Sequence, residues 1–142
     1  MRVSASINDG TPYFLGSDVV MDTIFDTTGN FFPGDGLGGS ATFTAPTTGK
    51  YYLNMCVAAI GDELISGHAL MEIVTTARTY TTEFYANVDT VNFYTMQFSV
   101  CADMSALDEA TFNVMPIDFT GNFAVNGSAD TTPQTWVSGF II

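Results

Sequence analysis

Residues that could carry catalysis or bind a metal are few in this chain. His68 is the only histidine among the 142 residues, so a hydrolytic triad would have to be built on it. The surrounding stretch ISGHAL is not a nucleophile elbow, and nothing in the sequence marks a nucleophile. A zinc site would need Cys56, Cys101 and His68, which lack the spacing of zinc ligands. The sequence therefore predicts no enzyme and no cofactor.

Carboxylates gather in segments that the sequence indicates are loops. They are Asp35 within PGDGLGG, the pair Asp62 and Glu63, and the pair Asp108 and Glu109. Calcium takes several oxygen ligands, often from loops, so a calcium site stays open as an alternative. No Asp-x-Asp-x-Asp-Gly run is present, and solvated loop carboxylates are the simpler interpretation. PGDGLGG also lacks the lysine and the following helix of a phosphate-binding loop.

The charge balance excludes two classes of partner. Fifteen acidic residues against three basic ones, Arg2, Lys50 and Arg78, give a formal net charge of −12. Nucleic-acid backbones and anionic membranes both require a cationic surface, so we expect neither as a direct partner. No apolar run approaches the ~18 residues of a membrane span. The N-terminus lacks the apolar core of a signal peptide, so we expect no secretion and two cysteine thiols.

The elements that must position any site are β-strands. Segments rich in Val, Ile, Thr, Phe and Tyr alternate with Gly, Pro, Asn and Asp. Strands are predicted over 3–7, 19–25, 41–45, 50–60, 69–80, 91–102, 110–117, 122–125 and 134–142. Asn126-Gly127 predicts a tight hairpin turn. MSALDEA predicts a turn between two strands and is the one place where a single helical turn is plausible. Many short strands without crossover helices predict one all-β domain over residues 1–142, an antiparallel sandwich or jelly roll.

Two of these strands are apolar on both faces. In 50–60, Tyr51 and its alternate neighbours form one face, and Tyr52, Asn54, Cys56 and Ala58 form a second that is hardly polar. TWVSGFII behaves in the same way, with Trp136, Phe140 and Ile142 on one side. A sandwich needs only one apolar face per strand. If both strands share a sheet, we expect its outer face to be covered, by another copy of the chain or by a loop; self-association is favoured.

The cysteines are predicted to lie too far apart for a disulfide. We expect Cys56 to point outward from one sheet and Cys101 outward from the other. A sandwich is ~10 Å thick, whereas a disulfide needs Cα atoms within ~7 Å.

Several segments together indicate a family. FTAPTTGKYYL, with Phe43, Pro46, Gly49, Tyr51 and Leu53, resembles a strand-turn-strand of the complement component 1q and tumour-necrosis-factor-like (C1q/TNF-like) jelly roll. IFDTTGNFFPGDG and the ending WVSGFII resemble further segments of that family. Pro46 suits a strand exit, Gly49 suits a positive φ in the turn, and Gly139 leaves room for a close approach.

More specifically, the chain resembles versions of this jelly roll in bacteriophage structural proteins, which often have an Asp-Met-x-x-x-Asp stretch such as DMSALD here. The resemblance implies a compact homotrimer, with the sheet of the first, last and central strands around a threefold axis. Its expected interface residues are Tyr52, Asn54, Cys56, Ala58, Trp136, Phe140 and Ile142.

The function expected from this resemblance is that of a phage virion structural protein. A trimeric decoration or cement protein would be made in the host cytoplasm and bind the major capsid protein on the capsid surface at threefold positions. The sequence begins directly in its first predicted strand, without a stalk or repeat, which favours this hypothesis over a fibre tip. The alternative is a binding module, either the receptor- or glycan-binding head of a fibre or a secreted complement-type ligand.

Overall fold

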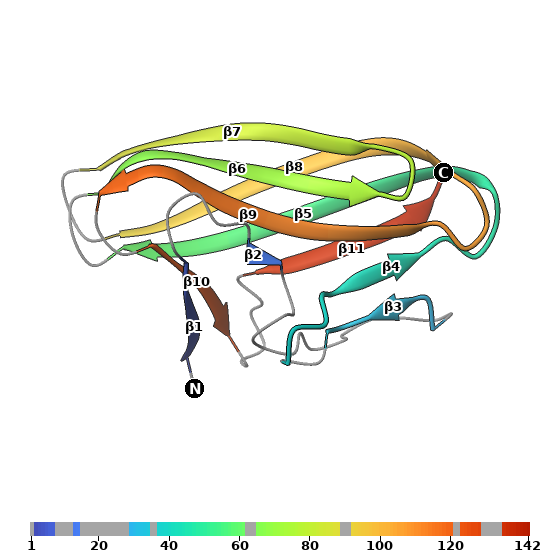
Figure 1. Ribbon diagram of the computed structural model, residues 1–142, viewed down its shortest axis with the longest axis horizontal. Coiled ribbons are helices and arrows are strands. Elements are labelled where there is room, and N and C mark those ends of the chain that lie inside the picture. Colours follow the sequence, from blue (N-terminus) through green and yellow to red (C-terminus); the bar gives the residue numbers. More distant parts are fainter. Residues whose placement is uncertain are drawn as a thin grey trace.

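The molecule is a sandwich of two antiparallel β-sheets (Figure 1). The computed structural model describes residues 2–7, 13–14, 29–34, 37–61, 65–88, 92–120, 123–128 and 135–142. The first sheet contains β1 (Arg2–Ile7), β5 (Gly49–Gly61), β8 (Asn92–Met104), β10 (Phe123–Ser128) and β11 (Trp136–Ile141). The second contains β2 (Tyr13–Phe14), β3 (Phe31–Phe32), β4 (Thr42–Thr44), β6 (Ile65–Thr75), β7 (Thr79–Val88) and β9 (Glu109–Thr120).

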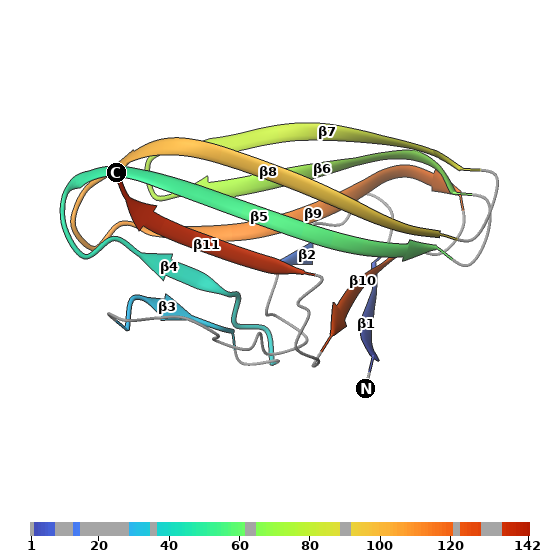
Figure 2. The same cartoon turned by 180° about the vertical axis from the view of Figure 1, so that it is seen from behind.

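The central strand of the first sheet is β5. Its full length pairs with β8 along one edge. Its other edge is shared by two strands, because β11 pairs with residues 51–56 and β10 with residues 59–61. The first, last and central strands of the chain therefore lie in one sheet, as the resemblance to the C1q/TNF-like jelly roll implied. Figure 2 views the molecule from the side of β11, β5 and β8.

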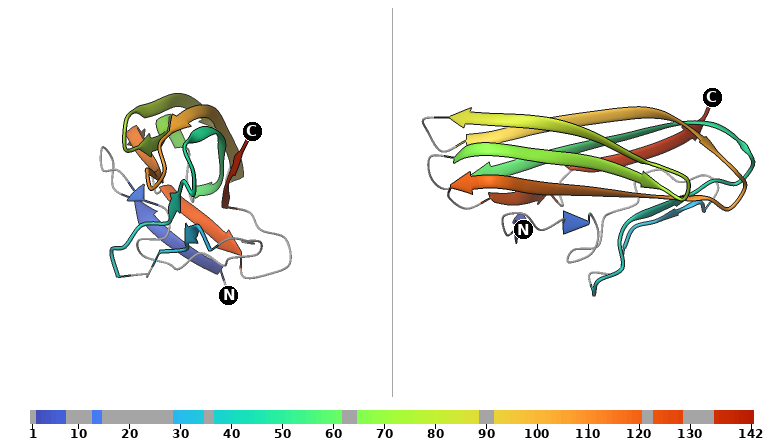
Figure 3. Two further views of the ribbon diagram at one scale, coloured as in Figure 1. Left: turned by 90° about the vertical axis from the view of Figure 1, so that its right-hand side faces the viewer. Right: turned by 45° about the horizontal axis from the view of Figure 1, so that its top comes forward.

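In the second sheet, β9 is flanked by β6 on one edge and by β2 and β4 on the other. The hairpin partner of β6 is β7, and the long strands of both sheets run lengthwise together in the right-hand view of Figure 3. In the part of the chain that is described, no helix is long and apolar enough to cross a membrane.

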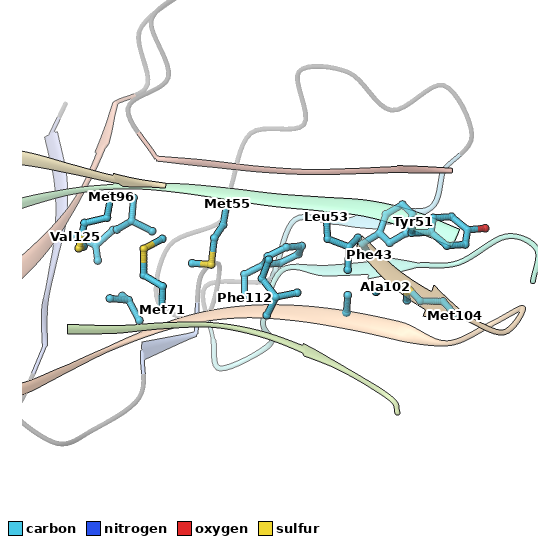
Figure 4. Packing of buried hydrophobic residues seen from close by; sticks show 14 of the residues in the cluster. Phe43, Tyr51, Leu53, Met55, Met71, Met96, Ala102, Met104, Phe112 and Val125 are labelled. Atoms are coloured by element: carbon cyan, nitrogen blue, oxygen red, sulfur yellow. The ribbon is translucent and has the colours of Figure 1, made fainter. Parts of the chain in front are cut away.

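The core lies between the inner faces of the two sheets (Figure 4). One face of β5 supplies Tyr51, Leu53, Met55 and Val57, each no more than 1% exposed. Phe112 of β9 and alternate residues of β6 meet them from the opposite sheet, and alternate residues of β8 lie beside them on the inner face of the first sheet. The predicted inward face of segment 50–60 is therefore confirmed over residues 51–57. Tyr51 keeps its hydroxyl satisfied by donating to the Thr47 carbonyl oxygen at 2.6 Å, which ties the β4–β5 turn to the core.

One predicted strand is in fact two. Segment 69–80 spans the end of β6, a turn and the start of β7. The turn contains neither Gly nor Pro, and this is why the sequence pattern missed it. Thr75 makes it instead, because its hydroxyl donates to the Arg78 carbonyl at 2.8 Å and accepts from the Arg78 N–H at 3.0 Å. The hairpin places Leu70 and Glu72 opposite residues of β7.

Two further local predictions are wrong. Asn126-Gly127 is not a turn but part of β10, paired with Ser4 and Val3 of β1. Pairing along β1 gives this segment a ladder that outweighs its turn propensity. The stretch MSALDEA is the predicted turn between two strands, but it is not helical: it is the tight β8–β9 turn, in which the Asp108 N–H donates to the Ser105 carbonyl at 3.0 Å. The predicted strand 19–25 lies outside the described residues.

Pro46 lies in the turn after β4, Gly49 begins β5, and Gly139 lies within β11. Pro46 follows β4 in an exposed turn, as expected of a strand exit. Gly49 does not have the positive φ that we expected. A Cβ there would lie 2.9 Å from Ile141 Cδ1, the end of a half-exposed side chain that can move aside, so space alone does not require glycine at this position. A Cβ on Gly139 would meet Leu53 at 3.0 Å and the Phe43 ring at 3.1 Å, so the predicted close approach is confirmed.

Candidate functional surfaces

The outer face of the first sheet brings most of the predicted interface residues together. In the β11–β5 register, Trp136 is opposite Cys56, Ser138 is opposite Asn54 and Phe140 is opposite Tyr52. Opposed residues of antiparallel strands point to the same face. Because Val137 packs on the core and Gly139 faces Leu53 and Phe43, the even-numbered residues of β11 point outward. Trp136, Ser138 and Phe140 therefore lie on the outer face of the first sheet.

The exposed apolar part of this face lies at its C-terminal end. The rings of Tyr52 and Phe140 lie 5.3 Å apart with an angle of 38° between their planes. Phe140 is 54% exposed and Ile142, just beyond β11, is 63% exposed. The Ile142 N–H donates to the Lys50 carbonyl at 2.9 Å and so fixes the chain end against β5. Two large apolar side chains are thus held in place and face outward.

The middle of the same face differs from expectation. Asn54, Cys56 and Ala58 are only 4–7% exposed within the single chain, so they are buried without any second copy. The Asn54 side-chain oxygen accepts a hydrogen bond from the Ser99 hydroxyl at 3.0 Å. Burial raises the pKa of the Cys56 thiol, which keeps it protonated. These three residues lie below the surface of this face, so a partner would contact mainly the side chains around them.

The two cysteines share a sheet, which corrects their predicted placement. Cys101 lies on β8 opposite Tyr52, and Cys56 is opposite Gln97 of the same strand. Both therefore point to the outer face of the first sheet. Four residues of strand separate them, about 13 Å at ~3.3 Å per residue, well beyond the ~7 Å limit for a disulfide. The two thiols are not bridged.

Sequence reasoning missed the β8 contribution to this face. Thr95, Gln97 and Cys101 are exposed and stand beside β5 on the outer side. Their alternation with buried Met96 and Ala102 was visible in the sequence. What the sequence could not supply was the neighbour, because β5 and β8 are separated along the chain by the β6–β7 hairpin.

The outer face of the second sheet presents a different cluster. Tyr85 of β7 is 76% exposed, and its hydroxyl donates to Glu83 Oε2 at 2.9 Å. This hydrogen bond raises the pKa of Tyr85, so the phenol stays protonated. His68 of β6 lies opposite Tyr85, with ring centroids 5.4 Å apart and an interplanar angle of 30°. His68 is therefore far from both cysteines and packs against an aromatic ring.

Two of the acidic residues that the sequence placed in loops are described, and both lie at the β8–β9 turn. Asp108 Oδ2 accepts the Ser105 N–H at 2.8 Å and so closes the β8–β9 turn. Glu109 begins β9. Asp35, Asp62 and Glu63 lie outside the described residues. Within the described residues, no group of three or more His, Cys, Asp or Glu side chains is arranged to hold a metal ion.

Comparison with known proteins rests on structure. No family model matches the sequence, and no curated protein matches it either. Among solved structures, the globular domain of zebrafish complement 1qA protein superimposes with a TM-score of 0.53 at 15% sequence identity, over 99% of this chain and 96% of that one. The chain therefore has a C1q-like, antiparallel jelly-roll fold, similar to that domain over nearly its whole length.

Proposed function

We propose that the protein is a homotrimeric virion component that decorates a phage capsid. In this proposal the outer face of the first sheet, formed by β11, β5 and β8, is the contact between subunits. The observation that carries the proposal is the exposed pair Phe140 and Ile142 beside Tyr52, since exposed large apolar groups in a cluster favour a protein partner.

The distribution of charge over the surface favours two further copies of the chain as that partner. Copies of a chain with net charge −12 repel one another wherever carboxylates face each other. On the outward positions of β11, β5 and β8 that are described, the charged residues are Lys50 and Asp103, which form an ion pair at 2.7 Å. This face is therefore electrically neutral, and two copies can approach through it without the repulsion that acts elsewhere.

The capsid role rests on the proposed trimer and on the phage-type resemblance of the sequence. A trimer matches a threefold position of an icosahedral shell, where each subunit can bind an equivalent copy of the major capsid protein. Such a particle would sit on the capsid surface after synthesis in the host cytoplasm. Neither nucleic acid nor membrane takes part in this proposal.

The test of the capsid role is a reconstruction of the virion that carries this sequence. We expect trimeric density of the size of this chain on the outside of the shell at threefold positions. A reconstruction without that density, from virions whose protein content includes this chain, would place it elsewhere in the particle and reject the decoration role.

A binding module is the second candidate, and one surface favours it. Tyr85 presents an exposed ring held by Glu83 on one side and His68 on the other. An aromatic ring beside a carboxylate acceptor suits the apolar face and the hydroxyl groups of a neutral sugar. A screen against neutral glycans tests this: loss of a bound glycan in Tyr85→Ala, with retention in Phe140→Ala, would favour a receptor- or glycan-binding head.

A further inference from the structure

The outward residues of the first sheet form rows that cross β11, β5 and β8. In one row, Phe140 lies opposite Tyr52. In the next row toward the chain end, Lys50 lies opposite Asp103, and the Ile142 N–H donates to the Lys50 carbonyl at 2.9 Å. This is the end of the sheet where β5 begins and where β8 and β11 end, at the left of Figure 2. The Lys50–Asp103 ion pair therefore lies beside the exposed apolar groups of this face.

Within a single chain, this ion pair contributes little to stability. Lys50 Nζ donates to Asp103 Oδ1 at 2.7 Å, but the two side chains are 66% and 80% exposed. Solvent screens an ion pair of this kind, and holding two flexible side chains together has an entropic cost. The hydrogen bond to Asp103 raises the pKa of Lys50, so its ammonium stays charged at neutral pH. The main consequence of the pair is that the charges of Lys50 and Asp103 cancel at this place on the surface.

A cation at this position is unusual for the chain. Lys50 is one of three basic residues, against fifteen acidic ones. Among the described outward residues of β11, β5 and β8, it is the only cation. Without it, Asp103 would give this face the negative sign of the chain as a whole. The neutrality of the face thus depends on Lys50.

The sign of the remaining surface indicates which partner the neutral face suits. The outer face of the second sheet carries the carboxylates Glu72, Glu83 and Glu109. A cationic partner would be attracted to these carboxylates rather than to the neutral face. Another copy of this chain carries the same net charge of −12, so it is repelled wherever the surface is acidic. Of the two outer faces, the neutral one therefore suits another copy better.

We propose that Lys50 controls self-association: its ammonium cancels the Asp103 carboxylate on the contact between copies, and loss of this one charge separates the trimer at low ionic strength. This inference rests on the proposed function and names the residue on which that contact depends. In the wild type, each copy meets its neighbours with a neutral surface. Without the Lys50 charge, each copy brings an uncancelled carboxylate to a strongly acidic neighbour, so association becomes unfavourable.

The response to salt distinguishes this effect from a loss of packing. The range of a charge repulsion falls from ~10 Å at about 0.1 M salt to ~3 Å at about 1 M, whereas apolar contacts between copies persist. A trimer lost because the Asp103 carboxylate is uncancelled should therefore return at high salt. A trimer lost because the Lys50 side chain no longer packs on a neighbour should not.

The experiment is sedimentation of the purified chain over a range of protein concentrations, at about 0.03 M and about 1 M sodium chloride. Lys50→Gln removes the charge, Lys50→Arg keeps it, and the double variant Lys50→Gln with Asp103→Asn removes both charges of the pair. Arg78→Gln is the matched control, because it removes one positive charge from an exposed site in the β6–β7 turn. Circular dichroism checks that every variant is folded, as we expect for changes at exposed side chains.

At low salt, we expect the trimer of Lys50→Gln to dissociate at least about 10-fold more readily than that of the wild type. At high salt, its dissociation should come within about threefold of the wild type. Lys50→Arg, the double variant and Arg78→Gln should stay within about threefold of the wild type at both salt concentrations, because they leave the face neutral.

The outcomes separate this inference from the proposed function. A wild type that sediments as a monomer would reject the proposed trimer and leave the neutral face to another partner, and the role of Lys50 would be overturned with it. A trimeric wild type whose Lys50→Gln variant is equally stable at low salt would overturn the role of Lys50 alone. Equal dissociation of Arg78→Gln would assign the effect to the total charge of the chain, and equal dissociation of the double variant to a lost lysine contact. Either of these two results also overturns the inference.

Discussion

The two outer faces of the sandwich differ in their charge and in their exposed apolar groups. On the first sheet, the described outward residues of β11, β5 and β8 include one ion pair, two exposed large apolar groups near the chain end and a buried polar centre at Asn54. On the second sheet, the outward positions of β6, β7 and β9 carry the carboxylates Glu72, Glu83 and Glu109. One outer face is neutral although the whole chain is strongly acidic. The proposed self-association depends on this difference in charge between the two faces.

The largest effect should come from placing a charge on the neutral face. Phe140→Glu removes an exposed aromatic ring and brings three carboxylates together around the proposed threefold axis, so the trimer should dissociate at least about 100-fold more readily. Sedimentation over a range of concentrations measures this. Tyr85→Glu makes the same kind of change on the acidic face and should leave the mass unchanged; equal dissociation of both variants would refute the difference between the faces.

A smaller effect should follow from disturbing β11 beneath the neutral face. Gly139→Val forces a branched side chain against Leu53 and the Phe43 ring, which lie within 3.0–3.1 Å of the position of its Cβ. Overpacking of this kind costs about 1–3 kcal/mol in the free energy of unfolding. Urea denaturation measures it. Ser138→Val, one residue away and directed outward, should change stability by less than about 0.5 kcal/mol; a larger loss in Ser138→Val than in Gly139→Val would contradict the assigned orientation of β11.

Two tyrosine hydroxyls sharpen the contrast between interior and surface. Tyr51 is buried and donates to the Thr47 carbonyl at 2.6 Å, so Tyr51→Phe leaves that acceptor unpaired and should cost about 1 kcal/mol in the free energy of unfolding. The Tyr85 hydroxyl is exposed and bonded to Glu83, so Tyr85→Phe should have no measurable effect on stability. If both variants lose the same stability, the β4–β5 turn is not held by Tyr51.

The smallest effect concerns the thiols of the neutral face. Burial raises the pKa of Cys56, so the folded state holds this proton more tightly than the unfolded state does. Its contribution to stability is complete below the ordinary thiol pKa and is lost as the pH rises through the raised one. We expect the loss of stability at alkaline pH to be slightly smaller in Cys56→Ala than in the wild type. In native protein, a thiol reagent should modify exposed Cys101 well before Cys56; the reverse order would be inconsistent with the burial of Cys56.

How much of this could be read from the sequence depended on how local each signal was. The alternation of residues 51–58 predicted the inner face of β5, and the segments around Pro46 and Gly139 carried the resemblance to the C1q/TNF-like jelly roll, because these signals lie within a few residues. The turn at Thr75 and the pairing of Asn126-Gly127 in β10 were missed, since a side-chain hydrogen bond and a distant strand decided them. The positive φ predicted for Gly49 was wrong, because Gly49 already lies in the extended backbone of β5.

The candidate surfaces were predictable only in part. The outward set on β5 and β11 was correctly grouped, but its exposure was not, because the burial of Asn54, Cys56 and Ala58 depends on side chains that the sheet places around them. The positive φ of Leu107 in the β8–β9 turn, 71°, gave no signal in the sequence, since MSALDEA contains no Gly or Asn to mark it.

The central claim is that the neutral face of the first sheet is covered by further copies of the chain. Sedimentation equilibrium of the purified protein at micromolar concentration tests it most directly. The account predicts a single species of three times 15.2 kDa, together with loss of that species in Phe140→Glu. A well-folded protein that sediments at 15.2 kDa over the whole concentration range would contradict it.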